Sequence, residues 1–277
     1  MPELPELDVV REVLAQRVVG KRIARVELFQ PMASLVVRDL TARGFVETLT
    51  GTVFENVTRR GKFLLLAFRH PVTAQLALNP KLTGRLQLAA PNAKRHKKTA
   101  VAFSLANGSE LRYYDDKSMG QLYLTEDLAR VPDFARMGPE PFDLTREQFR
   151  ARLKSYRGEI KGILTRGDFV AGIGNAYADE ILWHAQLHPY RKRTQLTPQE
   201  TDRLYDAMQT TLREAIAQVR AAMGENIHLE PRAFFAVHMK TGEPCPRCGT
   251  TISEIRANQR VTNFCRACQP GGLIRGM

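Results

Sequence analysis

Apolar residues recur at helical spacing close to the start of the chain. Leu7, Val10, Leu14 and Val18 lie three or four positions apart, and Gly20 follows where a helix would need a C-terminal cap. This pattern predicts a helix over residues 7–19.

From about residue 23 to residue 124 the pattern changes to short runs that are typical of strands. The clearest runs are 52–58, 62–68, 100–105 and 111–114, and glycines or Asn107-Gly108 separate them. Such closely spaced strands with turn residues between them predict a β-sandwich or a barrel.

Periodicity lapses between about residues 126 and 143, where proline and glycine accumulate, so we expect a domain boundary there. Beyond it, Thr145 to Gln148 and Thr197 to Glu200 both fit the capping box that starts a helix. The second domain is therefore expected to begin with helices.

Length and charge narrow the class of protein. The 277 residues suit two domains, and 43% hydrophobic residues can supply a core for each. No apolar run approaches the roughly 18 residues of a membrane span, and the acidic start differs from an export signal, so we expect a cytoplasmic protein. The net charge of +12 favours a large anionic partner such as nucleic acid, although a basic surface can also serve solubility.

All four cysteines lie near the C-terminus, as Cys245-x2-Cys248 and Cys265-x2-Cys268. This spacing is typical of a structural zinc site with four thiolate ligands, whereas two CxxC disulfides are the alternative. The segment between the pairs predicts a hairpin with strands at 251–256 and 261–264. Its turn would carry Gln259 and Arg260 outward on a zinc ribbon.

The N-terminus offers a candidate nucleophile. If Met1 is removed, Pro2 becomes a secondary α-amine, and such amines are far less protonated near neutral pH than lysine. An iminium formed by proline keeps its positive charge and can drive elimination. The alternative is that Pro5 and Glu6 simply favour a helix start.

A second candidate site is the glycine turn that ends at Asn175. Gly172-Ile173-Gly174 precedes a predicted helix, and backbone N–H groups at a helix start attract phosphate. Asn175 can donate one further hydrogen bond to that phosphate.

Four motifs occur in order along the chain: Pro2-Glu3-Leu4-Pro5-Glu6, Arg60-Gly61-Lys62, Gly172-Ile173-Gly174-Asn175, and Gln259-Arg260 within the cysteine segment. With these motifs the chain resembles the formamidopyrimidine-DNA glycosylase and endonuclease VIII family over its whole length. The resemblance implies an α+β multidomain fold with DNA in the cleft between its lobes. It comprises an N-terminal catalytic β-sandwich with flanking helices (1–130), a linker (131–143), a helix-two-turn-helix DNA-binding module (144–238) and a zinc-ribbon finger (239–269).

The resemblance also implies residue roles. Pro2 would attack C1′ of the damaged nucleotide, Glu3 would act as general acid and base on the sugar, and Glu6 would orient the amine. Loss of the base and Schiff base formation would lead to β-elimination and usually δ-elimination. Lys62, Asn175 and Arg260 match phosphate-contacting positions. Because the target nucleotide must leave the stack, Leu82 is expected to act as an apolar wedge.

The chain departs from the formamidopyrimidine members where they have an Asp-Pro-Arg-Arg-Phe-Gly loop, since it has Asp115-Asp116-Lys117-Ser118-Met119-Gly120. Lys117 can supply charge and Met119 can act as a wedge, but no guanidinium is available to read the opposite base. The stretch from Gly224 to Pro244 is also shorter than in members that cap a flipped 8-oxoguanine. We therefore expect a formamidopyrimidine, an oxidised pyrimidine or an abasic site as the lesion.

The leading hypothesis is a monomeric, nucleoid-associated base excision repair enzyme that is both a DNA glycosylase and an abasic-site lyase. The predicted catalytic residues are Pro2, Glu3, Glu6, Lys62 and Arg260. The predicted DNA-binding residues are Lys62, Leu82, Lys117, Met119, Asn175, Gln259 and Arg260. The other hypothesis is a non-catalytic zinc-ribbon protein that binds damaged double-stranded DNA on the same scaffold. Both would bind DNA in a salt-dependent way, so covalent trapping distinguishes them.

Overall fold

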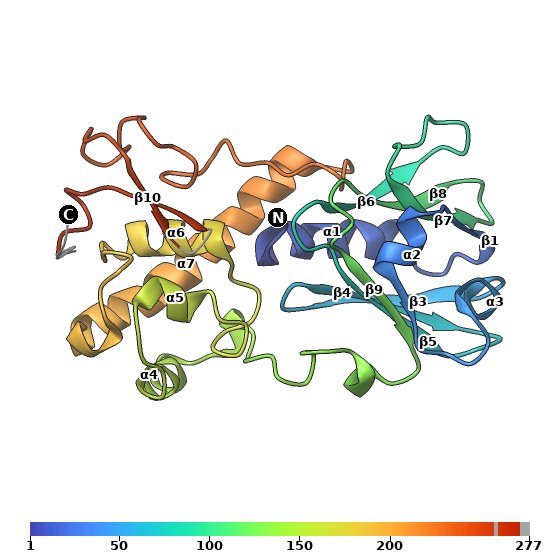
Figure 1. Ribbon diagram of the computed structural model, residues 1–277, viewed down its shortest axis with the longest axis horizontal. Coiled ribbons are helices and arrows are strands. Elements are labelled where there is room, and N and C mark those ends of the chain that lie inside the picture. The colour runs from blue at the N-terminus through green and yellow to red at the C-terminus, as the bar shows by residue number, and fades with distance from the viewer. Residues whose placement is uncertain (258–259, 272–277) are drawn as a thin grey trace. The chain divides into compact units, whose positions relative to one another are not determined.

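The computed structural model describes residues 1–257 and 260–271, which form two compact units (Figure 1). The N-terminal unit consists of Met1–Arg136 and Val219–Pro231, and the C-terminal unit of Met137–Gln218 and Arg232–Met277. The chain thus returns to the N-terminal unit after building most of the C-terminal unit.

Two sheets form the N-terminal unit. One has the strand order β1-β7-β8-β6, with β1 (Ile23–Leu28), β6 (Gly84–Ala89), β7 (Thr99–Leu105) and β8 (Glu110–Asp115). The other has the order β2-β9-β5-β4-β3, with β2 (Val37–Asp39), β3 (Val53–Arg60), β4 (Phe63–Arg69), β5 (Ala74–Asn79) and β9 (Gln121–Thr125). β2 pairs with β9 in parallel, and the other strand pairs in these two sheets are antiparallel.

The two sheets share one core. Phe54 of β3 and Phe103 of β7 are buried, and their ring centroids lie 6.5 Å apart with the rings edge to face. Phe68 of β4 packs against Phe54 at 5.0 Å. Aromatic side chains from facing sheets fill the layer between them, so the predicted sandwich is confirmed.

Helix α1 (Leu4–Arg17) precedes the sandwich and packs against β3 and β4. It begins earlier than the apolar stripe indicates, because Glu3 is its N-cap and Pro5 lies in its first turn. Two short helices, α2 (Met32–Val36) and α3 (Phe45–Leu49), complete this part of the unit.

The C-terminal unit begins with helices, as expected. They are α4 (Arg146–Lys154), α5 (Ile160–Leu164), α6 (Asn175–His184) and α7 (Pro198–Met223), whose last residues from Val219 belong to the N-terminal unit. The 3₁₀ turns lie at Pro141–Asp143 and Arg193–Gln195 in this unit and at Leu128–Arg130 in the N-terminal unit. Both predicted capping boxes form: the backbone N–H groups of Thr145 and Thr197 donate to Gln148 and Glu200 at 2.9 Å each.

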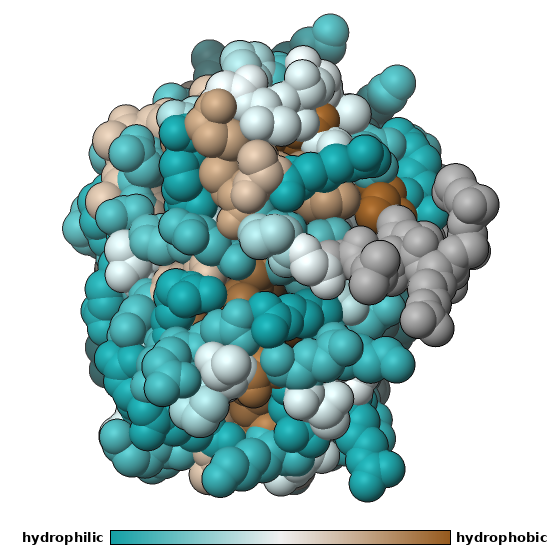
Figure 2. Space-filling view, turned by 90° about the vertical axis from the view of Figure 1, so that its left-hand side faces the viewer, coloured by the Kyte–Doolittle hydropathy of each residue, from teal (hydrophilic) through white to brown (hydrophobic). Residues whose placement is uncertain are grey.

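The cysteine segment carries the predicted hairpin, formed by β10 (Ser253–Ala257) and β11 (Arg260–Phe264). Ala257 pairs with Arg260, so the turn is shorter than the predicted 257–260. No helix in the described part of the chain is long and apolar enough to cross a membrane. Hydrophilic side chains predominate on the face seen in Figure 2, where the most hydrophobic residues show between them and a smaller group of moderately hydrophobic residues lies on the upper surface.

Candidate active site

The first residues of the chain are fixed by the start of α1. Glu3 and Glu6 are 2% and 1% exposed, and the backbone N–H of Glu3 donates to Glu6 Oε2 at 2.9 Å. Pro2 is buried directly before them. The helix-start interpretation and the reactive interpretation of this segment are therefore compatible, because the same hydrogen bond that caps α1 also fixes the backbone next to Pro2.

The turn that carries Lys62 belongs to the same unit. It joins β3 to β4, and the last residue of β3, Arg60, pairs with the first residue of β4, Phe63. Between them, Gly61 adopts a left-handed φ of +56°. Arg59 donates to the Gly61 carbonyl at 3.0 Å and pairs with Asp8 of α1 at 3.4 Å. This arginine links the Lys62 turn to the helix that follows Pro2.

Two exposed apolar side chains stand on neighbouring loops of the N-terminal unit. Leu82 is 38% exposed and Met119 is 49% exposed. Each follows a non-glycine residue in the left-handed region, Lys81 at φ +50° and Ser118 at φ +52°. A left-handed backbone conformation is unfavourable for residues other than glycine, so surrounding contacts must stabilise it.

Asp115 supplies those contacts. It is 2% exposed and accepts hydrogen bonds from Thr83 Oγ1 at 2.5 Å, from Gly120 N at 2.6 Å and from Lys117 N at 3.2 Å. Because Thr83 belongs to the Leu82 loop and Gly120 to the Met119 loop, one buried carboxylate ties both loops together. The Lys117 side chain itself is exposed.

Asn175 is the first residue of α6, in the C-terminal unit. Its Nδ2 atom donates to the Val261 carbonyl of β11 at 2.7 Å, a bond that uses one of the two amide hydrogens. Lys161 of α5 donates to the same carbonyl at 3.1 Å. The predicted phosphate-contacting asparagine is therefore bound to the strand residue next to Arg260.

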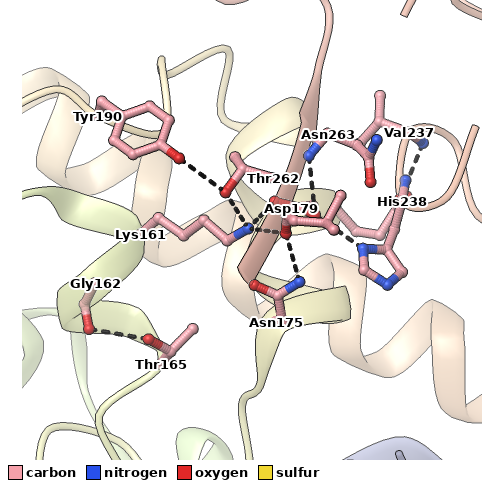
Figure 3. A network of polar contacts seen from close by, with 12 residues as sticks. Lys161, Gly162, Thr165, Asn175, Asp179, Tyr190, Val237, His238, Thr262 and Asn263 are labelled. Atoms are coloured by element: carbon pink, nitrogen blue, oxygen red, sulfur yellow. Dashed lines mark hydrogen bonds and ion pairs between the residues drawn. The ribbon is translucent and has the colours of Figure 1, made fainter. Parts of the chain in front are cut away.

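A buried network surrounds that junction (Figure 3). Lys161 lies 2.7 Å from Asp179 Oδ1 and donates to Thr262 Oγ1 at 2.8 Å, and Asp179 Oδ2 lies 2.8 Å from His238 Nδ1. Asp179 is 0% exposed and Lys161 6% exposed, so the ion pair is shielded from water. The Asn263 backbone N–H also donates to Asp179 at 3.2 Å, which joins β11 to α6.

The sequence did not single out Lys161 or Asp179 as site residues. Neither lies in a motif with a recognisable spacing, and their contacts join segments that are far apart in the chain.

The four cysteines form one cluster, with their sulfurs within 4.8 Å of one another. Cys245 and Cys268 Sγ lie 3.9 Å apart, and Cys248 and Cys265 Sγ 3.5 Å apart. Four thiolates about 2.3 Å from one tetrahedral zinc ion would be roughly 3.8 Å apart, so the spacing fits a metal and is too long for disulfides. Hydrogen bonds from Thr250 lower the pKa of the Cys248 thiol to about 6, which favours the thiolate that a metal needs.

The structure describes the predicted finger residues only in part. Gln259 lies outside the described residues. Arg260 is the first residue of β11, where its backbone pairs with Ala257, and its side chain lies outside what the structure describes.

Comparison with protein families covers nearly the whole chain. Residues 1–122 match the formamidopyrimidine-DNA glycosylase N-terminal domain, residues 137–225 match the H2TH domain of the same glycosylase, and residues 242–271 match a zinc finger found in FPG and IleRS. The three matches follow the chain in the order of the sandwich, the helices and the cysteine hairpin.

Similar proteins were found among curated sequences and solved structures. Formamidopyrimidine-DNA glycosylases of Symbiobacterium thermophilum and Bacillus cereus are 37% and 36% identical, and each alignment covers 98% of this chain and 90% and 99% of theirs. The Lactococcus lactis Fpg complex with abasic-site DNA has a TM-score of 0.85 at 31% identity, covering 97% of this chain and 100% of that one. MutM in complex with carbocyclic 8-oxo-G DNA has a TM-score of 0.83 at 31% identity, covering 98% and 100%.

Proposed function

Because this chain belongs to the formamidopyrimidine-DNA glycosylase family, we propose that it removes damaged bases from double-stranded DNA and cuts the strand with the amine of Pro2. It is a DNA glycosylase and abasic-site lyase of base excision repair. Full-length similarity to named glycosylases does not favour the non-catalytic alternative.

The observation that carries the residue assignment is the way α1 begins. Pro2 and Glu3 come directly before the helix, and the Glu3 backbone is held by Glu6 at 2.9 Å. After removal of Met1, the Pro2 nitrogen would thus sit on a rigid element, with a carboxyl group on the next residue. Rigid placement of nucleophile and acid is what a covalent mechanism requires.

The proposed reaction starts with Glu3 donating a proton to the sugar ring oxygen while the Pro2 nitrogen attacks C1′. The base leaves with its bonding electrons and takes up the N–H proton of Pro2, and the ring-opened sugar and Pro2 form a cationic imine. Loss of the proton at C2′ then expels the 3′ phosphate by β-elimination, and a second elimination expels the 5′ phosphate. Water releases Pro2 from the remaining sugar fragment.

Seven residues are proposed to hold the DNA. Lys62 and Arg260 would pair with phosphates near the lesion, and the second amide hydrogen of Asn175 would bind another phosphate. Leu82 and Met119 would fill the space that the flipped nucleotide leaves, because both side chains are exposed on loops held by Asp115. Lys117 would add charge, and Gln259 would accompany Arg260.

Further assignments follow from the same chemistry. One zinc ion held by Cys245, Cys248, Cys265 and Cys268 would be structural, since four protein ligands leave no position for water. The preferred lesion would be a formamidopyrimidine, an oxidised pyrimidine or an abasic site, because the 115–120 loop has no arginine to read the opposite base. We expect a monomer that works in the cytoplasm, where its chromosomal substrate would lie in the nucleoid.

Borohydride trapping on an abasic duplex tests the central assignment. The processed protein should give a covalent protein–DNA adduct, and Pro2→Gly should greatly slow cleavage while DNA binding stays largely intact. Pro5→Ala is a matched control, because it changes the other proline of the segment without changing the terminal amine. Equal cleavage rates for Pro2→Gly and the unaltered protein would refute the assignment.

A further inference from the structure

Glu230 lies in the segment that returns to the N-terminal unit after α7, and charged groups contact its carboxylate. The amino nitrogen of Met1 lies 2.7 Å from Glu230 Oε1, and Arg85 of β6 pairs with the other oxygen, Oε2. The side chains of Glu230 and Arg85 are only 16% and 14% exposed. This carboxylate is therefore held close to the chain start by a half-buried guanidinium.

The contact with Met1 limits how far Glu230 can be from Pro2. One residue spans at most about 3.6 Å of chain, so the 2.7 Å contact places the Pro2 nitrogen within about 6.3 Å of Glu230 Oε1. An opposite charge at such a distance strongly favours the protonated form of an amine in a poorly hydrated site.

A small, mainly apolar pocket supports the same arrangement. Pro2, Glu6, Arg85, Ile227 and Leu229 are among the residues that line it. Glu6 and Arg85 are its titratable lining residues within the described part of the chain, and Glu6 already accepts the Glu3 N–H. An amine at Pro2 would thus lie near Glu6 of α1 and Arg85 of β6 in this pocket, beside Glu3 in the chain, and within about 6.3 Å of Glu230 Oε1.

We propose that Glu230 is the counter-ion and proton acceptor of the Pro2 amine in the processed enzyme, and that Arg85 positions it. The inference rests on the proposed role of Pro2. The Pro2 ammonium transfers one of its two protons to the Glu230 carboxylate, and the freed lone pair attacks C1′. The second N–H proton leaves with the departing base when the iminium forms. The Glu230 carboxyl then returns the proton to solvent, and its negative charge stabilises the iminium cation that follows.

The test is the pH dependence of borohydride trapping on an abasic duplex, measured with the full processed chain between about pH 5 and pH 9. Glu230→Gln removes the negative charge and leaves Arg85 unpaired, and both changes favour the unprotonated amine. The pH of half-maximal trapping rate should therefore fall by about one unit. Glu230→Asp keeps the charge and should keep this pH close to that of the unaltered protein.

Glu225→Gln is the matched control, because Glu225 lies on the same segment but is 70% exposed and pairs with Arg17. It should leave the pH profile unchanged. If Glu230→Gln leaves the pH of half-maximal trapping rate unchanged, the inference is overturned, even if the maximal rate falls. A merely structural role of Glu230 would lower the rate without moving this pH. Absence of any adduct with the unaltered protein would instead refute the role of Pro2 and the inference together.

Discussion

Lys161 shows how a single buried side chain can hold two parts of the C-terminal unit together. Its ammonium contacts Asp179 of α6 and both the Val261 carbonyl and the Thr262 hydroxyl of β11. The ammonium thus donates two hydrogen bonds to β11 and forms an ion pair with Asp179, and such partners offset the cost of burying a charge. The position of β11, and with it the backbone of Arg260, depends on this residue.

Lys161→Met should destabilise the C-terminal unit by roughly 3 to 5 kcal/mol, because it leaves the buried Asp179 carboxylate without its cation. Denaturant unfolding followed by fluorescence of Trp183, the single tryptophan of the chain, measures this unit. Lys154→Met is the control, since Lys154 is exposed on α4. Equal unfolding midpoints for the two variants would contradict the role of the network.

His188 gives the C-terminal unit a predictable pH dependence. It is 4% exposed, its Nδ1 atom accepts the Tyr190 backbone N–H at 3.3 Å, and burial lowers its pKa from the ordinary value of 6.5. When the pKa of a histidine is lower in the folded protein than in the unfolded chain, the unfolded chain takes up the proton first as the pH falls. The free energy of unfolding therefore decreases between the pKa of the unfolded chain and the lower pKa of the folded protein. The stability that His188 contributes should therefore fall below about pH 6.5.

His188→Gln removes this titration while keeping a polar side chain. We expect the difference in unfolding midpoint between the unaltered protein and the variant to shrink as the pH falls from 7.5 to 5. Comparing the two proteins at each pH removes the contribution of the cysteine ligands, which is common to both. A difference that stays constant over this range would show that His188 does not titrate with folding.

At the level of elements, the loops that carry Leu82 and Met119 are packed against one hydroxyl group. A Cβ atom on Gly120 would lie 1.7 Å from Tyr113 Oη, and one on Gly84 would lie 2.2 Å from it. Tyr113 is 0% exposed, so its ring has little room to retreat. Both glycines are therefore required by close approach, and the two loops share a support from β8.

Gly120→Ala should destabilise the N-terminal unit by about 1 to 3 kcal/mol through overpacking, as measured by scanning calorimetry. In a Tyr113→Phe background the same substitution should be less harmful, because the nearest clashing atom is gone. Gly162→Ala is the control, since a Cβ there meets nothing within 4 Å. Purely additive effects of Gly120→Ala and Tyr113→Phe would contradict this packing.

Elements with local signals could be predicted from the sequence. The capping boxes at Thr145 and Thr197 form as expected. The cysteine hairpin could be predicted because two short runs of strand-forming residues lie on either side of a few turn-forming residues. The Lys161–Asp179 pair could not be predicted, because it joins α5 to α6 and β11, and no local pattern reports a contact over such a separation.

At the level of the whole chain, the sequence indicated a boundary near residues 126–143 but not the return of Val219–Pro231 to the N-terminal unit. That return brings Arg220 to Glu12 and Glu225 to Arg17, at 2.9 Å each. Each is an ordinary charged residue in its own segment, so only the folded chain reveals the pairing. Glu230 escaped sequence analysis for the same reason.

The net charge of +12 implies that DNA affinity depends strongly on salt, since each neutralised phosphate releases counterions. Arg260→Ala should weaken binding to abasic, formamidopyrimidine and undamaged duplexes alike, and should reduce the slope of log Kd against log salt concentration by about one. Arg256→Ala is the control on the same hairpin, because Arg256 is exposed and pairs with Glu254. A loss confined to one lesion would mean that Arg260 reads a base, and an unchanged slope would mean that it contacts no phosphate.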